Sequence, residues 1–444
     1  MPNDHHEPDR IRRITRPGTL ALGLFLWAAT AAGAGPAAQG LTLDKYFSAA
    51  LDRSEVVAIQ SELIRQAEER YQQSISALLP TVSGDASYLW QESLTSDVPS
   101  TSTSLLNRQP LAKLTATQPL FRGFREFAAL RQTQALVGAQ KDDRLNAQVL
   151  LYKDVVQNFY NVLSFEQDLR NFEEEIRQNL DRETELKARV RIGRSRDSEI
   201  LNVQTTIGTL RALIEQTRGQ LRVERETFAF LSGLDASTPL DDTEPMPGGL
   251  KPLDDYLARI ELRPDVKASR KRQTAAQENV TQAKGAHLPS LDLNGNYYFD
   301  RPGTLKDITW DVQLALTVPI YSGGSLMSKT REAMSQKTQA DLTTSQISRQ
   351  AEQEIRSLYQ TVVFDALQLD ALEKSTEAAK KSYEAQRRDY RLGLVTNLDV
   401  LQSLSSFQVN QRALDRARYN AKLDFIKLQA ATVNRNGLGD SAAP

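Results

Sequence analysis

The chain has 444 residues, and its 55 Lys and Arg are balanced by 56 Asp and Glu, so it lacks the basic surplus of a typical nucleic-acid-binding protein. It has no Cys, which excludes disulfides, thiolate catalysis and anchoring through a lipid-modified Cys. It also contains no nucleophile-elbow, P-loop or paired-histidine motif, and only three His in all. The composition therefore argues against an enzyme, and we expect no cofactor and no dedicated metal site.

Residues 1–38 have the pattern of a signal peptide. Four Arg between positions 10 and 16 precede an apolar run from Leu20 to Ala32, and small residues follow it. The run is too short and too rich in Gly and Ala for a membrane-spanning helix. We predict cleavage and export of the remaining chain, with an uncleaved anchor as the alternative.

The remaining sequence repeats one plan, in residues 39–234 and again in 253–433. A Pro-, Gly- and Asp-rich stretch over 235–252 separates the two copies and predicts a linker. Residues 434–444 predict a flexible tail. The interval of about 200 residues is far longer than a solenoid unit, and it indicates one duplicated module.

Short motifs recur in the same order in both copies. Gln118–Gly123 (QPLFRG) is echoed by Val318–Gly323 (VPIYSG), and the turn at Gly193 is echoed by the turn at Gly393. Prolines at 80, 119, 289 and 319 mark predicted junctions between helix and strand, because Pro cannot donate a hydrogen bond to a helix or a central ladder.

Each copy begins with a helix and then changes to a period of two, which predicts a β-hairpin. The first hairpin covers 81–120 and the second covers 290–320, where apolar residues from Leu291 to Phe299 alternate with polar ones. Alternating strands of about 10 residues with aromatics near their ends resemble membrane strands. A soluble sandwich with one wet face would give the same alternation in any single strand.

Very long helices follow the hairpins, over 124–190 and 324–391. Neither stretch contains Pro, and each would span about 100 Å at 1.5 Å per residue. A turn containing Gly then leads into a returning helix, over 196–232 in the first copy and 397–432 in the second. The first long helix has a coiled-coil seam of apolar residues: Leu145, Val149, Tyr152, Val156, Phe159 and Leu163.

Four strands cannot close a barrel in a membrane. A lipid-exposed strand edge would leave backbone groups unsatisfied, and the smallest membrane barrels need about eight strands. Three copies in cyclic symmetry would supply 12 strands, and closed symmetry is the usual solution. The fold class we predict is mainly α with membrane β, internally duplicated: a trimeric 12-stranded transmembrane β-barrel, with four strands from each chain, continued by a long α-helical coiled-coil barrel.

The duplicated plan of helix, hairpin and helix, the P-[LI]-[FY]-x-G junctions and the Gly tips followed by acids resemble the TolC family of outer membrane factors. The resemblance covers residues 41–433. It implies a homotrimer in the outer membrane of a Gram-negative bacterium, with a large periplasmic part. It further implies a passive exit duct of a tripartite efflux pump or type I secretion system. Its partners would be a periplasmic adaptor and an inner-membrane transporter of the RND, ABC or MFS type.

The resemblance also implies a narrow periplasmic aperture ringed by acids. Asp399 and Glu199 each lie six residues after a tip Gly, and a trimer would present each as a ring of three. Such a ring favours cations and raises the pKa of its own carboxyl groups. Gln402 stands where members of that family often carry a second acid, and Val395 stands where some members carry an Arg that locks neighbouring hairpins. The alternative is that both acids only complement a helix dipole.

Two further sets of residues are candidates. The resemblance implies that the tips contact the adaptor through Arg191, Gly193, Arg391, Gly393, Leu394 and Thr396. On the strands, the polar residues that alternate away from the apolar face predict a barrel lumen lined by Asp292, Asn294, Asn296, Asp311 and Gln313.

Three other classes remain as alternatives. An enzyme is disfavoured by the missing motifs. A periplasmic adaptor also has coiled-coil hairpins, but it would carry one hairpin among small β-domains. A purely structural coiled-coil protein would not need four alternating strands.

Overall fold

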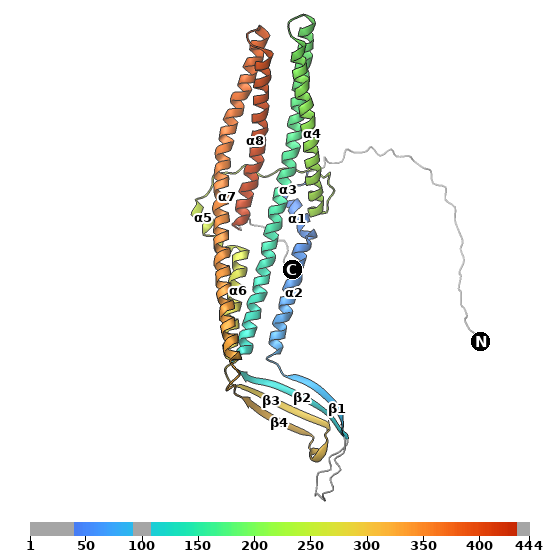
Figure 1. The fold of residues 1–444 in the computed structure, drawn as a ribbon, viewed down its shortest axis with the longest axis vertical. Coiled ribbons are helices and arrows are strands. Elements are labelled where there is room, and N and C mark those ends of the chain that lie inside the picture. Colours follow the sequence, from blue (N-terminus) through green and yellow to red (C-terminus); the bar gives the residue numbers. More distant parts are fainter. Residues whose placement is uncertain (1–39, 92–107, 433–444) are drawn as a thin grey trace, which may run out of the picture. The chain divides into compact units, whose positions relative to one another are not determined.

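The computed structural model describes residues 40–91 and 108–432. The predicted signal peptide, the predicted tail and most of the loop of the first hairpin lie outside these described residues. The described part contains two bundles of helices above a four-stranded sheet (Figure 1). None of its helices is both long enough and apolar enough to cross a membrane.

Two helices of nearly equal length form the frame. Helix α3 (Arg125–Arg191) has 67 residues and α7 (Ser325–Leu392) has 68. Both run from the sheet to a tip, about 100 Å away at 1.5 Å per residue. Their length follows from the absence of Pro and from the scarcity of Gly in both stretches.

Shorter helices pack end to end along each long helix. Along α3 lie α2 (Glu55–Ser76) and then α4 (Asp197–Ser232), with α1 (Leu43–Arg53) between them. Along α7 lie α6 (Pro264–Gly285) and then α8 (Asn397–Ala431). Helices α6 and α8 also contact α3, so the two repeats share one body (Figure 1).

The first helix of each repeat is interrupted, where one continuous helix was expected. In the first repeat, Ser54 leaves the helical conformation and its side chain accepts a hydrogen bond from the Val57 N–H at 3.4 Å, which starts α2. In the second repeat, α5 (Leu253–Leu257) and a 3-10 turn (Ile260–Leu262) precede α6, because Pro264 must stand in the first turn of a new helix.

The central core is rich in tyrosine and phenylalanine. Tyr46, Tyr152, Phe159, Tyr160 and Phe228 are fully buried where α1, α3 and α4 meet. The hydroxyl of Tyr46 donates to Asn158 Oδ1 at 2.8 Å, so the buried polar group is satisfied. Of the predicted seam on α3, only Leu145 is exposed; the other five residues are buried.

The sheet has the order β1-β2-β3-β4 and is antiparallel throughout. Its strands are β1 (Thr81–Trp90), β2 (Arg108–Arg122), β3 (Ser290–Asp300) and β4 (Trp310–Thr317). The chain places both hairpins in one sheet, because β2 of the first repeat pairs with β3 of the second. Strands β1 and β4 form its two edges.

Pro119 is not at a junction, as the sequence pattern predicted, but inside β2. The register between β2 and β3 shifts between Pro119 and Phe121, and this irregularity accommodates the missing N–H. In the second repeat β4 ends at Thr317, ahead of Pro319, as the junction interpretation requires. The chain therefore continues as a strand past Pro119 in the first repeat, whereas in the second repeat the strand ends before Pro319.

Where β2 passes into α3, two backbone segments approach each other closely. Gly123 has φ +69°, and a Cβ there would lie 2.1 Å from the carbonyl oxygen of Gly285, at the end of α6. Gly323, its counterpart in the second repeat, has φ +62° but open space around it.

We predict that Gly123→Ala destabilises the protein more than Gly323→Ala. Both changes place a methyl group on a left-handed residue, at a cost of about 1–2 kcal/mol. Only Gly123→Ala also forces α6 away from β2, which adds a packing cost of about 1–3 kcal/mol. Apparent melting temperatures in mild detergent at one scan rate would measure the difference, and equal shifts would contradict the role given to the Gly123–Gly285 contact.

Candidate functional site

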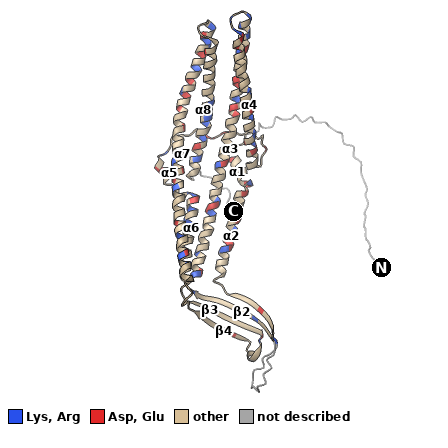
Figure 2. Cartoon of the chain, viewed as in Figure 1, with Lys and Arg blue, Asp and Glu red and all other residues tan. Residues whose placement is uncertain are grey.

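The two faces of the sheet differ in chemistry. One face carries the five predicted lumen residues together with Ser83, Asp85, Lys113, Thr115 and Thr117, as the strand registers place them. The other face carries Val82, Tyr88, Leu114, Leu293, Tyr297, Val312, Leu314 and Leu316, and all of these are exposed. Figure 2 shows few charged residues on the sheet. An apolar face of this extent requires a partner outside the chain.

Hydrogen bonds tie the polar face together across three strands. Thr117 Oγ1 donates to Asn294 Oδ1 and Thr115 Oγ1 donates to Asn296 Oδ1, both at 2.9 Å. Asn296 Nδ2 in turn donates to Asp311 Oδ1 at 2.8 Å. Arg122 forms an ion pair with Asp292 at 2.8 Å, at the end of the sheet next to the helices.

Both tips have the same backbone construction. Gly393 and Gly193 have φ +78° and +71°, and each closes its helix with a left-handed residue. The next residue donates back to the long helix: Leu394 N–H to the Asp389 carbonyl at 3.0 Å, and Arg194 N–H to the Arg189 carbonyl at 2.9 Å. All six predicted adaptor-contacting residues are exposed at the tips: Arg191, Gly193, Arg391, Gly393, Leu394 and Thr396.

The two tips differ in how the returning helix begins. In the second tip Thr396 and Asp399 form a capping box: Asp399 Oδ2 accepts from the Thr396 N–H at 2.8 Å and from its hydroxyl at 2.6 Å. In the first tip Glu199 Oε2 accepts only from Ser195 Oγ, at 2.8 Å.

The capping box changes the electrostatics expected for Asp399. The hydrogen bond from the Thr396 side chain, followed by that from its backbone, lowers the pKa of the Asp399 carboxyl in the single chain. The increase in carboxyl pKa that was predicted for a ring of carboxylates would need three chains. Within one chain Asp399 and Gln402 line a polar cavity of about 280 Å³ between α7 and α8, together with Gln386 and Ser403.

Sequence reasoning missed a cluster that joins the two hairpins near their tips. Arg182 of α3 is only 7% exposed, and its Nε and Nη2 donate to Asn397 Oδ1 at 2.9 and 2.5 Å. Its guanidinium lies 4.0 Å from the ring centre of Tyr390, and the guanidinium of Arg189 lies 4.3 Å from the same ring. Desolvated cation–π contacts of this kind contribute about 2 kcal/mol.

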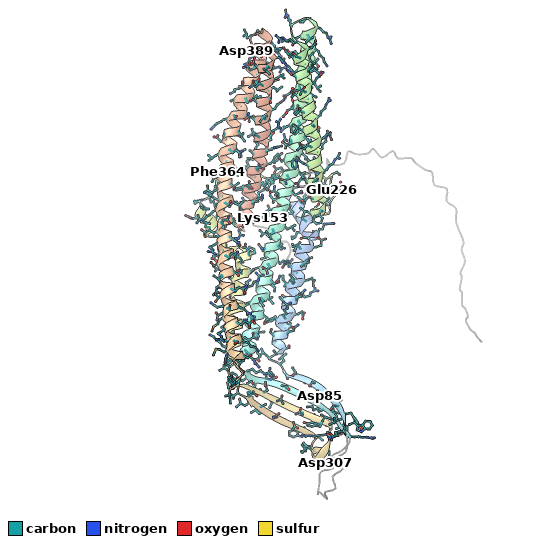
Figure 3. The ribbon with its side chains drawn as sticks, in the orientation of Figure 1. Asp85, Lys153, Glu226, Asp307, Phe364 and Asp389 are labelled. Atoms are coloured by element: carbon teal, nitrogen blue, oxygen red, sulfur yellow. The ribbon has the colours of Figure 1, made fainter. Side chains whose placement is uncertain are left out.

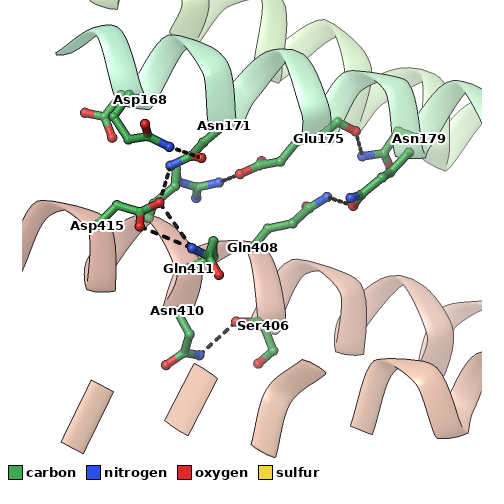
Figure 4. Close-up of polar contacts among 12 residues, drawn as sticks. Asp168, Asn171, Glu175, Asn179, Ser406, Gln408, Asn410, Gln411 and Asp415 are labelled. Carbon is green, nitrogen blue, oxygen red and sulfur yellow. Dashed lines mark hydrogen bonds and ion pairs between the residues drawn. The ribbon is translucent and has the colours of Figure 1, made fainter. Parts of the chain in front are cut away.

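The polar contact continues along α3 and α8, below the Arg182 cluster. Arg416 Nε donates to both carboxylate oxygens of Asp168, which is almost fully buried, at 2.9 and 3.1 Å. Asn171 donates to Asp415 at 2.9 Å, and Arg412 pairs with Glu175 (Figure 4). The hairpins of the two repeats are therefore joined near the tips largely through polar side chains. The spacing of apolar residues cannot predict such an interface.

No group of three or more His, Asp or Glu side chains gathers as a metal site would require in residues 40–91 and 108–432.

Comparison with known proteins agrees with this architecture. The model of the family described as "Outer membrane efflux protein" matches residues 47–234 and 258–433, one stretch for each repeat. Among solved structures, the outer membrane protein VceC from Vibrio cholerae aligns with a TM-score of 0.77 at 17% identity, over 88% of this chain and 95% of that one. This similarity shows a shared fold.

Two curated relatives are similar in sequence. The outer membrane protein TolC of Escherichia coli (strain K12) is 26% identical over 38% of this chain and 38% of its own length. The outer membrane efflux protein BepC of Brucella suis is 22% identical over 71% of this chain and 70% of its own length. The matched part thus spans well under half of the TolC relative.

The family model covers most of both repeats and accounts for the sheet, the long helices and the tips together. The chain therefore belongs to the outer membrane efflux protein family, a family of outer membrane channels and not of enzymes, which confirms the predicted localisation with its large periplasmic helical part.

Proposed function

We propose that the protein is the exit duct of a tripartite efflux pump or type I secretion system. Three copies would close a 12-stranded barrel in the outer membrane and a helical tube in the periplasm. The duct would conduct its cargo passively, and a periplasmic adaptor with an inner-membrane transporter of the RND, ABC or MFS type would supply energy and selection. Homotrimer, adaptor and transporter are all part of the proposal.

The observation that carries the proposal is the sheet itself. It has an exposed apolar face, a hydrogen-bonded polar face and two unpaired edges, at β1 and β4. In hydrocarbon each unsatisfied backbone group would cost several kcal/mol, so the edges must be paired by other strands. Pairing β4 of one copy with β1 of the next satisfies both edges at once and turns the apolar face to lipid.

The same closure assigns the polar face to the lumen. Asp292, Asn294, Asn296, Asp311 and Gln313 would then line a water-filled passage. The hydrogen bonds among Thr115, Asn296 and Asp311 would hold these side chains against the wall, which keeps the passage open.

The mass of the protein in mild detergent tests this closure. We expect light scattering, corrected for bound detergent, to give three chains for material extracted from outer membranes. The four strands of one copy are too few to close a barrel, which needs about eight strands at least. A monomer would contradict the proposal, as would protein found only in the soluble periplasmic fraction.

The tips are the proposed contact with the adaptor. Besides the six predicted residues, they expose the apolar side chains of Ile192, Leu392 and Leu398, for which the described part of the chain offers no cover. An exposed apolar group on a rigid turn with several Arg around it has the composition of a protein-binding surface.

We predict that Gly393→Leu abolishes transport and leaves the trimer intact. The leucine would occupy open space on the tip surface and strain a residue at φ +78°. Loss of resistance to an exported compound, in cells with normal amounts of trimer, would measure the effect. Gly208→Leu is the matched control, because Gly208 also faces open space but lies in the middle of α4. Normal transport by Gly393→Leu would contradict the adaptor contact.

We further propose that the duct is closed by the acids and the Arg182 cluster together. Asp399, Glu199 and Gln402 would ring the aperture, and Arg182 would hold the α7–α8 hairpin against α3. Opening would then move this hairpin outward, which requires Arg182 to leave Asn397 and Tyr390. This arrangement would replace the tip lock that Val395 cannot provide.

We predict that Arg182→Met raises the conductance of the duct in planar bilayers several-fold. Losing charge-assisted hydrogen bonds to Asn397 costs on the order of 3 kcal/mol, enough to shift a closed–open equilibrium by about a hundredfold. Arg177→Met is the matched control, because Arg177 lies on the same helix but pairs only with Glu174, one turn away. Unchanged conductance of the Arg182→Met variant would contradict the proposal that Arg182 holds the α7–α8 hairpin closed. It would not contradict the proposed trimer.

A further inference from the structure

Each repeat contains a junction at which two short helices meet end to end beside a long helix. In the first repeat α4 ends and α2 begins beside α3, and in the second repeat α8 ends and α6 begins beside α7. A cavity lies at each junction, of about 790 Å³ in the first repeat and about 300 Å³ in the second. The two junctions share one plan, but their side chains fill them to different extents.

Charged side chains fill the junction of the second repeat. Arg263, just ahead of α6, donates from Nη1 to the Ala431 carbonyl at 3.0 Å, and its Nη2 pairs with Glu354 and with Asp265, both at 2.8 Å. Lys153, which lies midway between the sheet and the tips (Figure 3), pairs with Glu354 from α3. Burial alone would raise the pKa of the Glu354 carboxyl, but Lys153 and Arg263 lower it.

The duplication assigns a counterpart to each of these residues. Helices α3 and α7 run between equivalent Gly turns that lie 200 residues apart, and α2 and α6 both have 22 residues and begin at positions 55 and 264. The counterpart of Glu354 is therefore Asp154, and the counterpart of Arg263 is Ser54. The backbone of Ser54 has φ −64° and that of Arg263 has φ −62°. The first repeat thus keeps the acid of the junction and lacks its base.

Asp154 has no partner in its own chain. It lines the larger cavity and forms no hydrogen bond or ion pair within residues 40–91 and 108–432. Partial burial raises the pKa of its carboxyl, and the charge of Lys153 offsets this only in part. Two bases also line the cavity, but Arg272 pairs with Asp143, and the guanidinium of Arg53 lies against the end of α4. Asp154 therefore lacks a base.

A second copy of the chain can supply this base. Inside one chain the first repeat meets the second through β2 on β3 and through α3 on α6. In the proposed trimer β4 of one copy pairs with β1 of the next, which sets α7 of the first copy beside α2 of the next. Each contact between α3 and α6 then has a counterpart between α7 and α2 of neighbouring copies, and cyclic symmetry makes all three boundaries the same.

One ion pair supports this register. Arg131 of α3 pairs with Glu278 of α6 at 2.8 Å. Their counterparts are Arg331 of α7 and Glu69 of α2, which are residues of the same types. Both are exposed, and neither forms an ion pair in the part of the chain that the structure describes. The boundary between copies can therefore repeat the pair that joins α3 to α6 inside the chain.

The same register brings Arg349 to Asp154. Val149 of α3 lines the cavity of the second repeat, and its counterpart is Arg349 of α7. Arg349 is exposed and forms no ion pair with any other described residue. Placed as Val149 is placed, Arg349 of one copy would enter the junction that contains Asp154 of the next.

Two further replacements fit a single base at this junction. Val56 stands at the counterpart of Asp265, and Gln353 stands at the counterpart of Lys153. At these positions the second junction has two acids and two bases, whereas the first would have one acid and, from the neighbouring copy, one base. Both junctions would then be neutral, as buried charges require.

We propose that a second copy of the chain completes the first-repeat junction, with its Arg349 paired to Asp154 as Arg263 is paired to Glu354. The inference rests on the proposed function, since it requires β4 and β1 of neighbouring copies to pair. The ion pair would join neighbouring copies in the middle of the helical part, far from both the sheet and the tips.

Cross-linking tests the pairing, because the chain contains no native Cys. Asp154→Cys with Arg349→Cys, in isolated outer membranes, is treated with a short bifunctional methanethiosulfonate reagent. We expect bands of two and three linked chains on denaturing gels, and no such bands from either single variant. Arg131→Cys with Glu278→Cys is the matched control, since it should be linked within one chain. Glu69→Cys with Arg331→Cys tests the same register if the first double variant fails to fold.

A rescue experiment tests the role of the missing base. We expect Arg349→Ala to lower the temperature at which the trimer dissociates in detergent. Ser54→Arg restores to the first repeat the base that the second repeat carries, on a backbone of the same conformation. It should raise the dissociation temperature of the Arg349→Ala variant again. It should not do so when Asp154→Asn is also present.

The outcomes separate this inference from the proposed function. Absence of linked chains from both interchain pairs, with the control linked and three chains found by light scattering, would overturn the inference and leave the trimer standing. An unchanged dissociation temperature of Arg349→Ala would also overturn it. A monomer by light scattering would remove the proposed function itself.

Discussion

The structure depends on a sheet that cannot be complete in one chain. Four antiparallel strands leave the backbone groups of β1 and β4 unpaired, and one face of the sheet is apolar and exposed. In water such a sheet would associate without control, and in lipid its open edges would be prohibitively costly. In the proposed trimer, pairing with identical copies would resolve both problems. The long helices would then carry each β-hairpin at a fixed angle, because they are rigid elements. The Gly123–Gly285 contact holds the end of β2 against α6 where the sheet meets the helices, and the Arg122–Asp292 ion pair joins β2 to β3 at the same end of the sheet.

The helices are held together by different interactions in the central core and near the tips. Around Tyr46, Phe159 and Phe228 the helices pack through large buried rings, which favours one rigid arrangement. Towards the tips the contact between α3 and α8 is made by ion pairs and amides, with Asp168 and Arg182 among the buried groups. Polar pairs gain little net free energy when buried, yet they are costly to break singly. An interface of this kind suits two discrete arrangements of the hairpins better than a continuous range.

Much of the fold could be predicted because duplication doubled every weak signal. Single strands and single Gly turns are ambiguous, but their recurrence in the same order fixed the plan, and the alternation of Asp292, Asn294 and Asn296 placed them on one face. The remaining details depend on contacts between distant segments. The break at Ser54 and the position of Pro119 inside β2 follow from local pairing that periodicity does not encode. Arg182 was missed because an Arg on a long helix normally faces solvent. Only the fold brings Tyr390 and Asn397 to it, and Asn397 lies 215 residues further along the chain.

The two repeats have diverged where their surroundings differ, and this divergence carries information that neither copy holds alone. Their tips share the left-handed Gly but not the cap, since Asp399 is bound by Thr396 while Glu199 has only Ser195. Their junctions share Gly123 and Gly323 but not the crowding, since only Gly123 touches another backbone. A copy whose turn is free can use Gly at the next position, as Gly324 does. A copy whose turn is held rigidly can place a strained side chain there and keep it in a set position. Strain at Phe124, which has φ +60°, is therefore a consequence of the Gly123–Gly285 contact, and the two features should be gained or lost together.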